Sequence, residues 1–239
     1  MLTATLLLTL AQTAMVATAA EDLGTWQKRM PITFSGYPSG GETLTNFPAL
    51  VMLSNTTAGI GFNYADFLSP PYGDLRFTAA DKTNLLDFEI GSWDTSGRSY
   101  AWVRVPELTN SVTIYALWCQ SGVTSPPCTI NGAVWSNGFT GVWHLEETNG
   151  VTARDAIGNR YPGTMTGATA GMGATGQVGR AYRFGGNTGY VTIPLTNGTT
   201  VTISAWASKT TGADQVMVWS RATYNPDLWF YGATIYLNA

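Results

Sequence analysis

Alternating apolar and polar residues recur in short runs along the chain, and their period of two predicts β-strands. The clearest series lies between residues 73 and 106, where polar turn sequences separate one run from the next. A series with one apolar and one polar face is typical of an antiparallel sheet lying on a core. We therefore predict a three-stranded meander, with strands at residues 75–78, 85–90 and 100–106.

Similar runs before and after this series predict a single β-sandwich over residues 23–120, with about six to eight strands. The flanking strands are predicted at residues 26–34, 47–53 and 112–118. Residues 56–71 show no regular period, and we expect Phe62, Tyr64 and Phe67 to anchor a long loop there. Trp102 is expected in the core because it lies beside Val103 in a predicted strand.

Composition agrees with an all-β fold. Only 11% of the 239 residues are charged, 12% are aromatic, and there are 27 glycines, with Thr, Val and Tyr recurring between Gly, Asn and Pro. The length suffices for one large or two ordinary domains. The net charge is −3 and no basic stripe is visible, so binding of nucleic acid through its phosphates is not expected.

The first 20 residues are predicted to be a secretory signal peptide. An apolar run at residues 2–16 is followed by the small residues Ala17, Thr18 and Ala19. A transmembrane anchor is the alternative, but the run falls short of ~20 strongly apolar residues. No later run is as long, so we expect a mature chain without a membrane span, secreted or held at the cell surface.

Six ordered motifs appear between residues 26 and 115. They are Trp26…Arg29-x-Pro31-Ile32, Asn46-Phe47-Pro48, Gly73-Asp74-Leu75-Arg76-Phe77, Phe88-Glu89-Ile90-x-x-Trp93, Ala101-Trp102-Val103-Arg104-Val105-Pro106 and Thr113-Ile114-Tyr115. This order resembles a bacterial family of extracellular modules classed as a domain of unknown function. The resemblance implies a secreted β-sandwich without an established activity. It also implies covalently linked further domains, since such modules typically precede laminin-G-type modules in large secreted or surface proteins.

A second series of motifs begins at residue 139, where the composition becomes rich in Gly and Thr. The motifs are Gly141-Val142-Trp143-His144-Leu145, Asp155-Ala156-Ile157-Gly158-Asn159, Gly179-Arg180-Ala181-Tyr182-Arg183-Phe184-Gly185-Gly186, Gly189-Tyr190-Val191-Thr192-Ile193-Pro194 and Val201-Thr202-Ile203-Ser204-Ala205-Trp206. They are similar to the opening half of a laminin-G-like jelly roll of the concanavalin A superfamily. That family needs more strands than follow here, so the resemblance implies a C-terminally truncated jelly roll.

The predicted fold class is therefore all-β, an N-terminal antiparallel β-sandwich plus an incomplete concanavalin A-like jelly roll. The first jelly-roll motif, at residues 141–145, is a predicted strand, and residues 216–221, 228–231 and 234–237 also alternate as strands do. The predicted divisions are a signal peptide at 1–20, the sandwich at 21–128, a linker at 129–138 and the jelly roll at 139–239.

Asp87 and Glu89 are the first candidates for chemistry. They stand two apart on a predicted strand, so their carboxylates share a face and suit calcium or, with an opposing carboxylate, glycoside hydrolysis. Trp93 follows closely and offers a ring for a sugar to stack on. We take Asp87, Glu89 and Trp93 as candidate binding residues. The alternative is a solvated sheet face that carries charges without a function.

No catalytic residue is assigned in the second module. Glycoside hydrolases of the concanavalin A-like fold carry acidic residues alternating along one strand, whereas Glu146 and Glu147 are adjacent and point to opposite faces. His144 is the only histidine, and without a recognisable partner it is expected to be a structural or surface residue.

Asp155 and Asn159 lie in a Gly-containing turn and are candidate calcium ligands, as in some laminin-G-like modules. The alternative is turn chemistry alone, since Asp and Asn favour turns through local hydrogen bonds. No cofactor other than calcium is expected.

Cys119 and Cys128 are separated by eight residues that include two prolines. In an exported protein they are predicted to form a disulfide that closes a short loop. Two unpaired cysteines are the alternative, because no spacing rule enforces pairing.

The leading functional hypothesis is a non-catalytic binding or adhesion module pair of a secreted multidomain bacterial protein. Its expected partner is a glycan or another extracellular matrix or surface ligand. This rests partly on analogy of fold. The alternatives are a fragment of a secreted glycoside hydrolase and a structural spacer without a ligand.

Overall fold

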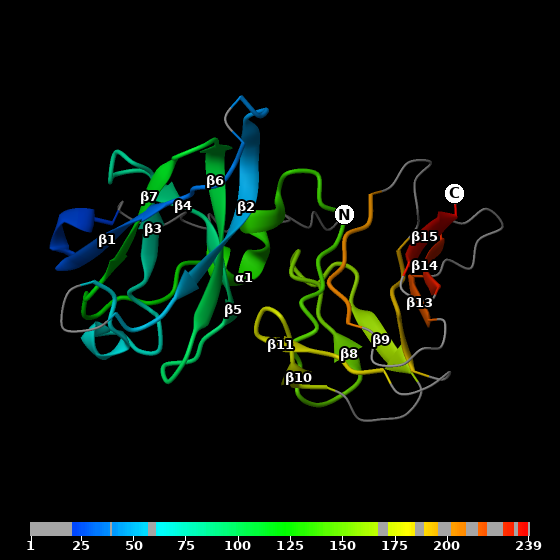
Figure 1. Ribbon diagram of the computed structural model, residues 1–239. Helices are drawn as coiled ribbons and strands as arrows, with labels where there is room; N and C mark the ends of the chain where they lie inside the picture. Colours follow the sequence, from blue (N-terminus) through cyan, green and yellow to red (C-terminus); the bar gives the residue numbers. More distant parts are fainter. Residues whose placement is uncertain are drawn as a thin grey trace, which may run out of the picture.

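The computed structural model describes residues 21–38, 40–56, 61–166, 172–184, 189–195, 202–208, 215–218, 227–231 and 234–238, the last three stretches through their backbone alone. The predicted signal peptide lies outside the described residues. An N-terminal unit, coloured blue to green, stands beside a second unit that continues to the C-terminus (Figure 1). In the described residues, no helix is long and apolar enough to cross a membrane.

The N-terminal unit is a β-sandwich of two antiparallel sheets, as predicted. The first sheet has the order β1 (Lys28–Thr33), β7 (Thr113–Trp118), β3 (Arg76–Thr78) and β4 (Leu85–Leu86). The second has the order β2 (Leu44–Leu53), β6 (Ser99–Leu108) and β5 (Phe88–Ser92). Two short 3-10 helices, η1 (Leu23–Thr25) and η2 (Tyr64–Asp66), lie outside the sheets. These seven strands fall within the six to eight that the sequence predicts.

The predicted single meander is wrong in one respect, because the chain changes sheets at Asp87. Leu86 pairs with Phe77 in the first sheet, whereas Phe88 pairs with Val103 in the second. The alternation of apolar residues continues across this break because Leu86 and Phe88 both face the same core. An alternation with a period of two shows which face of a strand each residue occupies. It does not show which strand is the neighbour in the sheet.

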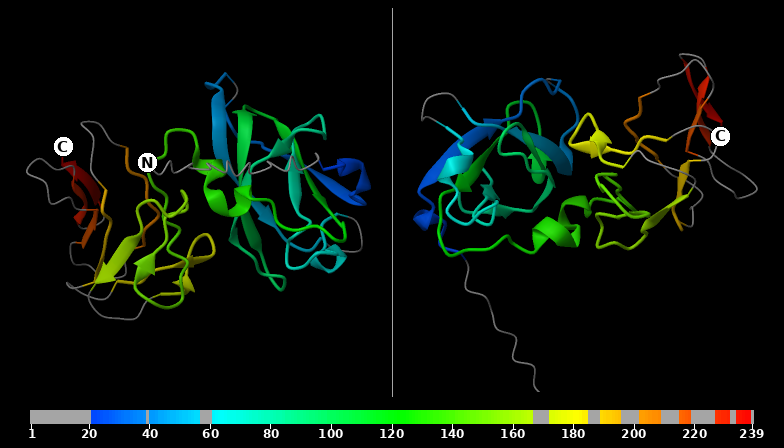
Figure 2. Two further views of the ribbon diagram at one scale, coloured as in Figure 1. Left: turned by 180° about the vertical axis from the view of Figure 1, so that it is seen from behind. Right: turned by 90° about the horizontal axis from the view of Figure 1, so that it is seen from below.

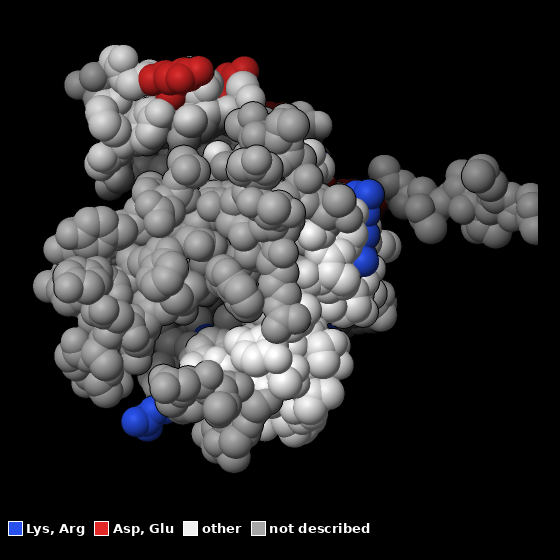
Figure 3. All heavy atoms as spheres, turned by 90° about the vertical axis from the view of Figure 1, so that its right-hand side faces the viewer, with Lys and Arg blue, Asp and Glu red and all other residues white. Residues whose placement is uncertain are grey.

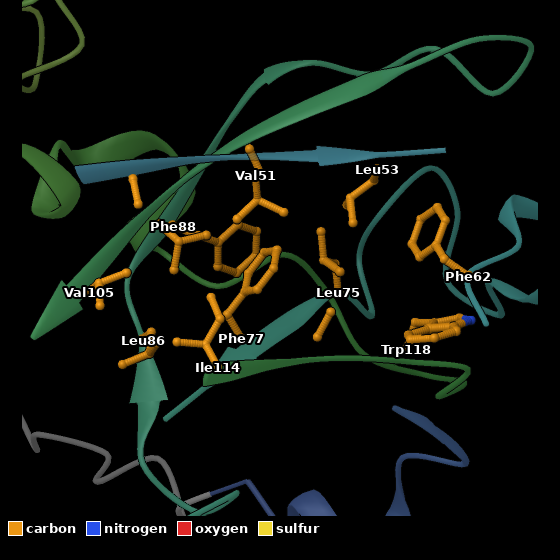
Figure 4. Packing of buried hydrophobic residues seen from close by; sticks show 14 of the residues in the cluster. Val51, Leu53, Phe62, Leu75, Phe77, Leu86, Phe88, Val105, Ile114 and Trp118 are labelled. Carbon is orange, nitrogen blue, oxygen red and sulfur yellow. The ribbon is translucent and has the colours of Figure 1, made fainter. Parts of the chain in front are cut away.

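The core lies between the two sheets. Phe77 of β3 and Phe88 of β5 meet edge to face across it, with ring centroids 5.2 Å apart (Figure 4). The predicted loop anchors Phe62, Tyr64 and Phe67 all join this core, which confirms them. The largest fully buried side chains are Trp118, Arg76, Phe62, Phe77, Phe88, Leu53, Leu75, Ile114, Leu117, Val103, Val105 and Val134.

Arg76 is the only charged side chain among those largest buried ones, and a complete set of acceptors surrounds it. Its guanidinium pairs with Glu21 at 2.5 Å and donates hydrogen bonds to the carbonyls of Gly73, Leu75 and Thr124. A buried guanidinium is tolerated only when its donors are satisfied in this way. The first residue after the predicted signal peptide is therefore tied to the fold.

The segment predicted as a linker, residues 129–138, is instead folded against the sandwich. It contains most of α1 (Cys128–Asn131) and the 3-10 helix η3 (Ala133–Trp135). Val134 is fully buried and Trp135 is 5% exposed, because both pack on the outer face of the second sheet. α1 lies at the junction of the two units (Figures 1 and 2). Apolar residues spaced among Gly, Ser and Asn predict a linker, but tertiary contacts bury Val134 and Trp135.

The second unit consists of small antiparallel sheets. Its strands are β8 (Thr152–Ala153), β9 (Gly163–Thr166), β10 (Ala174–Thr175), β11 (Arg180–Ala181), β12 (Tyr190–Thr192), β13 (Gln215–Val218), β14 (Asp227–Tyr231) and β15 (Thr234–Asn238). They form the sheets β12-β9-β8, β10-β11 and β13-β14-β15. The face of the molecule drawn in Figure 3 shows few charged side chains among its described residues.

One strand predicted in this unit does not form. Residues 141–145 contribute one isolated bridge, between Trp143 and Asp155. Val142 packs instead on the cluster of Val134, Trp135 and Ala156. A short alternating run did not suffice to specify a strand.

Cys119 and Cys128 are both free thiols in the structure, which therefore does not show the predicted disulfide. Cys119 is buried and Cys128 packs against the same core. Burial raises the pKa of the Cys128 thiol.

Candidate functional site

Asp87 and Glu89 share the outer face of the second sheet, as predicted, but neither is a free carboxylate. Asp87 forms a salt bridge with Arg104. Glu89 is 8% exposed and accepts a hydrogen bond of 2.6 Å from Nε1 of Trp135. The interpretation of a solvated face is therefore wrong for Glu89, whose carboxyl group lies inside a contact between two segments.

Trp93 does not join these two residues. Its ring packs edge to face against Phe62, Tyr64, Phe67 and Tyr72, with centroid separations between 5.2 and 6.4 Å. This aromatic cluster belongs to the core of the sandwich. The three candidate binding residues are thus divided between two places.

Trp102 lies on the outer face beside Glu89, and its expected place in the core is wrong. The pairing of β5 with β6 sets Trp102 opposite Glu89. Its ring contacts Trp135 at 5.2 Å and stacks on His144 at 6.0 Å between centroids. The residues of β6 that enter the core are Ala101, Val103, Val105 and Leu108. Trp102 therefore forms the base on which the second unit sits.

A cavity of about 270 Å³ opens at this junction. Four ionisable side chains of the second unit, His144, Glu146, Glu147 and Arg154, line it together with Glu89. Nε2 of His144 lies 3.4 Å from Oε1 of Glu89, an ion-pair distance without the geometry of a well-formed hydrogen bond. The single histidine, expected to be structural, thus stands in an ionisable cluster.

Glu146 has the most perturbed carboxyl group of the cavity. Burial raises its pKa from 4.5 to about 7, although nearby His144 acts in the opposite direction. The turn of the β10–β11 hairpin closes over it: a Cβ at Gly179 would lie 2.2 Å from Oε1 of Glu146 and 3.0 Å from Cβ of Ser92 in β5. Only glycine fits at this position, where φ is +60°. The hairpin therefore covers part of the Glu146 carboxyl and lowers its exposure to water.

Glu147 acts mainly in holding the second unit together. Its carboxylate accepts hydrogen bonds from the backbone N–H of Arg154 at 2.6 Å and from the hydroxyl of Tyr182 at 2.7 Å. Burial and this carboxylate raise the pKa of Tyr182 above its ordinary value. Glu146 and Glu147 point to different partners, as predicted for adjacent residues.

An open groove of about 420 Å³ lies on the other side of Trp135. Phe139 is 44% exposed in its wall, and its ring meets Trp135 edge to face at 5.4 Å. The remaining side chains that line the groove are Asn131, Ala133, Ser136, Thr140, Ile157 and Arg160. Trp135 thus lines the groove, while its N–H binds Glu89, which lines the cavity.

Gly132 allows the two units to meet beneath this groove. A Cβ there would lie 2.7 Å from Cα of Ile157 and 2.8 Å from the carbonyl oxygen of Ala156, and φ is +79°. Both the close backbone contact and the left-handed conformation require glycine. The turn at residues 156–158 consequently rests directly on the segment between α1 and η3.

Asp155 and Asn159 lie together in the predicted turn, where hydrogen bonds engage both. The Asp155 carboxylate is fully buried and accepts backbone N–H groups from Val142, Ile157 and Tyr161, each at 3.0 Å. Oδ1 of Asn159 accepts the N–H of Asp155. This is the turn chemistry given as the alternative to calcium. Among the described residues, no three His, Cys, Asp or Glu side chains form a group suited to a metal ion.

Sequence reasoning missed Trp135, Phe139 and Arg160. The first two stand in Trp135-Ser136-Asn137-Gly138-Phe139, inside and directly after the supposed linker. Two aromatic residues four apart in a segment without a strand period were the available signal, since large rings in a true linker would be exposed to water.

Residues 71–140 match the sequence model of a family described as a domain of unknown function (DUF2341). The match supports the resemblance of the N-terminal unit to such a domain, and it continues through α1, η3 and Phe139. It stops before His144, so the laminin-G-like resemblance of the second unit stays a prediction. Comparison with curated proteins and with solved structures found no match.

Proposed function

We propose that the chain is an extracellular pair of modules that binds a glycan without cleaving it. The observation that carries this proposal is the open groove of about 420 Å³ at the junction of the two units. The apolar C–H face of a sugar packs on an aromatic ring, and Phe139 offers such a ring to solvent. Asn131, Ser136 and Thr140 supply amide and hydroxyl groups for the sugar hydroxyls.

The shape of the groove favours a chain ligand over a small buried molecule. It is open to solvent along its length, and Trp135 forms a rigid floor because its N–H is fixed by Glu89. A rigid site loses little conformational freedom on binding. Secretion through the predicted signal peptide would bring this groove to extracellular or surface polysaccharides.

Replacing Phe139 by alanine is expected to weaken glycan binding about 5- to 10-fold, the worth of one aromatic contact. Ligands would be found on a glycan array with the full chain, and affinities measured by isothermal titration calorimetry. Phe47→Ala is the matched control, because Phe47 is exposed to 37% in β2 and does not line the groove. A chain that binds no glycan on the array would support the spacer interpretation instead.

Glycoside hydrolysis is the second candidate, favoured by two unequal carboxyl groups in one cavity. Glu146, with its pKa raised to about 7, is suited to act as a general acid, while Glu89 is stabilised by the N–H of Trp135. Two observations weigh against it. Glu89 already has its partners, and the cavity of about 270 Å³ lies below the usual size of ligand sites, about 300 Å³ or more.

A measurement of catalytic turnover distinguishes glycan binding from glycoside hydrolysis. We expect no release of reducing sugar from any glycan that the array identifies. Hydrolysis that Glu146→Gln abolishes, with binding and folding retained, would overturn the proposal in favour of an enzyme. Glu107→Gln, at an exposed position of β6, is the control.

A further inference from the structure

Arg160 is the only charged residue among the described residues that line the groove. Its side chain is exposed, and within the described part of the chain no carboxylate lies at ion-pair distance from it. Its guanidinium lies over the ring of Tyr161, 5.0 Å from the centroid. Stacking on an aromatic ring orients the planar guanidinium and restricts its motion.

The acidic groups of the junction lie on the other side of Trp135. Glu89, Glu146 and Glu147 line the cavity, whereas the described lining of the groove contains no acidic residue. The groove is therefore locally positive on a chain whose net charge is −3. This charge arrangement selects against cationic ligands and in favour of anionic ones.

We propose that the glycan bound in this groove carries acidic sugar units, and that Arg160 binds the carboxylate of one of them. The guanidinium presents two parallel N–H donors that match the two oxygens of a carboxylate. Phe139 contacts the C–H face of the sugar, and the hydroxyl and amide groups of the groove bind its neutral part. This inference rests on the proposed glycan-binding function and names the class of its ligand.

The test uses the full chain and two probes that differ only in charge, galacturonic acid oligomers and the same oligomers methyl-esterified. Calorimetry is expected to give about tenfold tighter binding of the free acid, as for one charge-assisted hydrogen-bonded pair at an exposed site. Arg160→Ala should reduce the affinity for the acid about tenfold and leave that for the ester unchanged. Arg160→Lys should keep part of the preference, because it retains the charge without the planar fork.

The control is Arg29→Ala, at an exposed position of β1 in the other sheet. Phe139→Ala should weaken both probes alike, which separates ring contact from charge. Equal affinity for acid and ester, unchanged by Arg160→Ala, would overturn the acidic ligand and leave glycan binding intact. Binding of neutral glycans on the array, without binding of either galacturonic acid probe, would also overturn the acidic ligand. A chain that binds no glycan at all would overturn the proposed function as well.

Discussion

Replacing Asp74 by alanine is expected to lower the free energy of unfolding of the N-terminal sandwich by about 3–5 kcal/mol. The carboxylate is fully buried and accepts three backbone N–H groups, from Leu68 at 3.0 Å, Ser69 at 3.3 Å and Gln120 at 2.9 Å. Alanine would leave all three donors buried without a partner. Urea unfolding followed by tryptophan fluorescence measures the loss.

Asp74→Asn should cost less than the alanine change, because an amide oxygen still accepts hydrogen bonds but carries no charge. Asp81→Asn is the matched control. The Asp81 carboxylate also accepts backbone N–H groups, from Thr83 and Asn84, but it does so at the surface, where water replaces it. An alanine variant at Asp74 as stable as that control would show that the three bonds contribute little.

Raising the pH from 5 to 8 is expected to destabilise the chain through Glu146 by about 1–2 kcal/mol, because its pKa is raised from 4.5 to about 7 and solvent screening at the partly exposed carboxyl reduces the full effect. Between these two values the folded state keeps a proton that the unfolded state has released. The folded state therefore keeps its full stability with respect to Glu146 below pH 4.5, and the free energy of unfolding declines as the pH rises toward 7. Above that pH the carboxylate is ionised in both states and the loss is complete.

The Glu146→Gln variant isolates this effect, since glutamine stays neutral at every pH. Its stability relative to the parent chain should rise between pH 5 and 8, measured as the difference in unfolding free energy at each pH. His144, Glu147 and Arg180, which surround the carboxyl, remain in the variant and cancel in the difference. Glu107→Gln, an exposed change of the same type, should show no such trend. A constant difference for Glu146→Gln would contradict the raised pKa.

The alternation of apolar residues was sufficient to predict the N-terminal sandwich. Val103 and Val105 enter the core on every second position of β6, and Phe62, Tyr64 and Phe67 anchor the long loop as expected. The sequence predicts these core positions because successive residues of a strand point to opposite faces, so the face of each residue follows from its place along the strand. The neighbouring strand with which each residue pairs is not decided locally. For this reason the sequence did not predict that the chain passes from one sheet to the other at Asp87.

The candidate site shows the same division. Glu89 was identified from its own neighbourhood, as an acidic residue on the outer face of a strand. Its partners Trp135 and His144 stand 46 and 55 positions further along the chain, and neither was predicted to meet it. Their meeting depends on two glycines, Gly132 and Gly179, whose missing side chains let backbone and carboxyl approach closely.

The amino-acid sequence by itself therefore determined the fold class, the approximate strands of the sandwich and most of the residues that face its core, with Trp102 as the exception. Only the tertiary structure decided that residues 129–138 are packed, that Trp102 contacts the second unit, and that the carboxyl of Glu146 is partly buried. The physical reason is that core burial follows a short-range period, whereas the groove and the cavity arise where segments far apart in the sequence pack together and reduce the exposure of each other's polar groups to water.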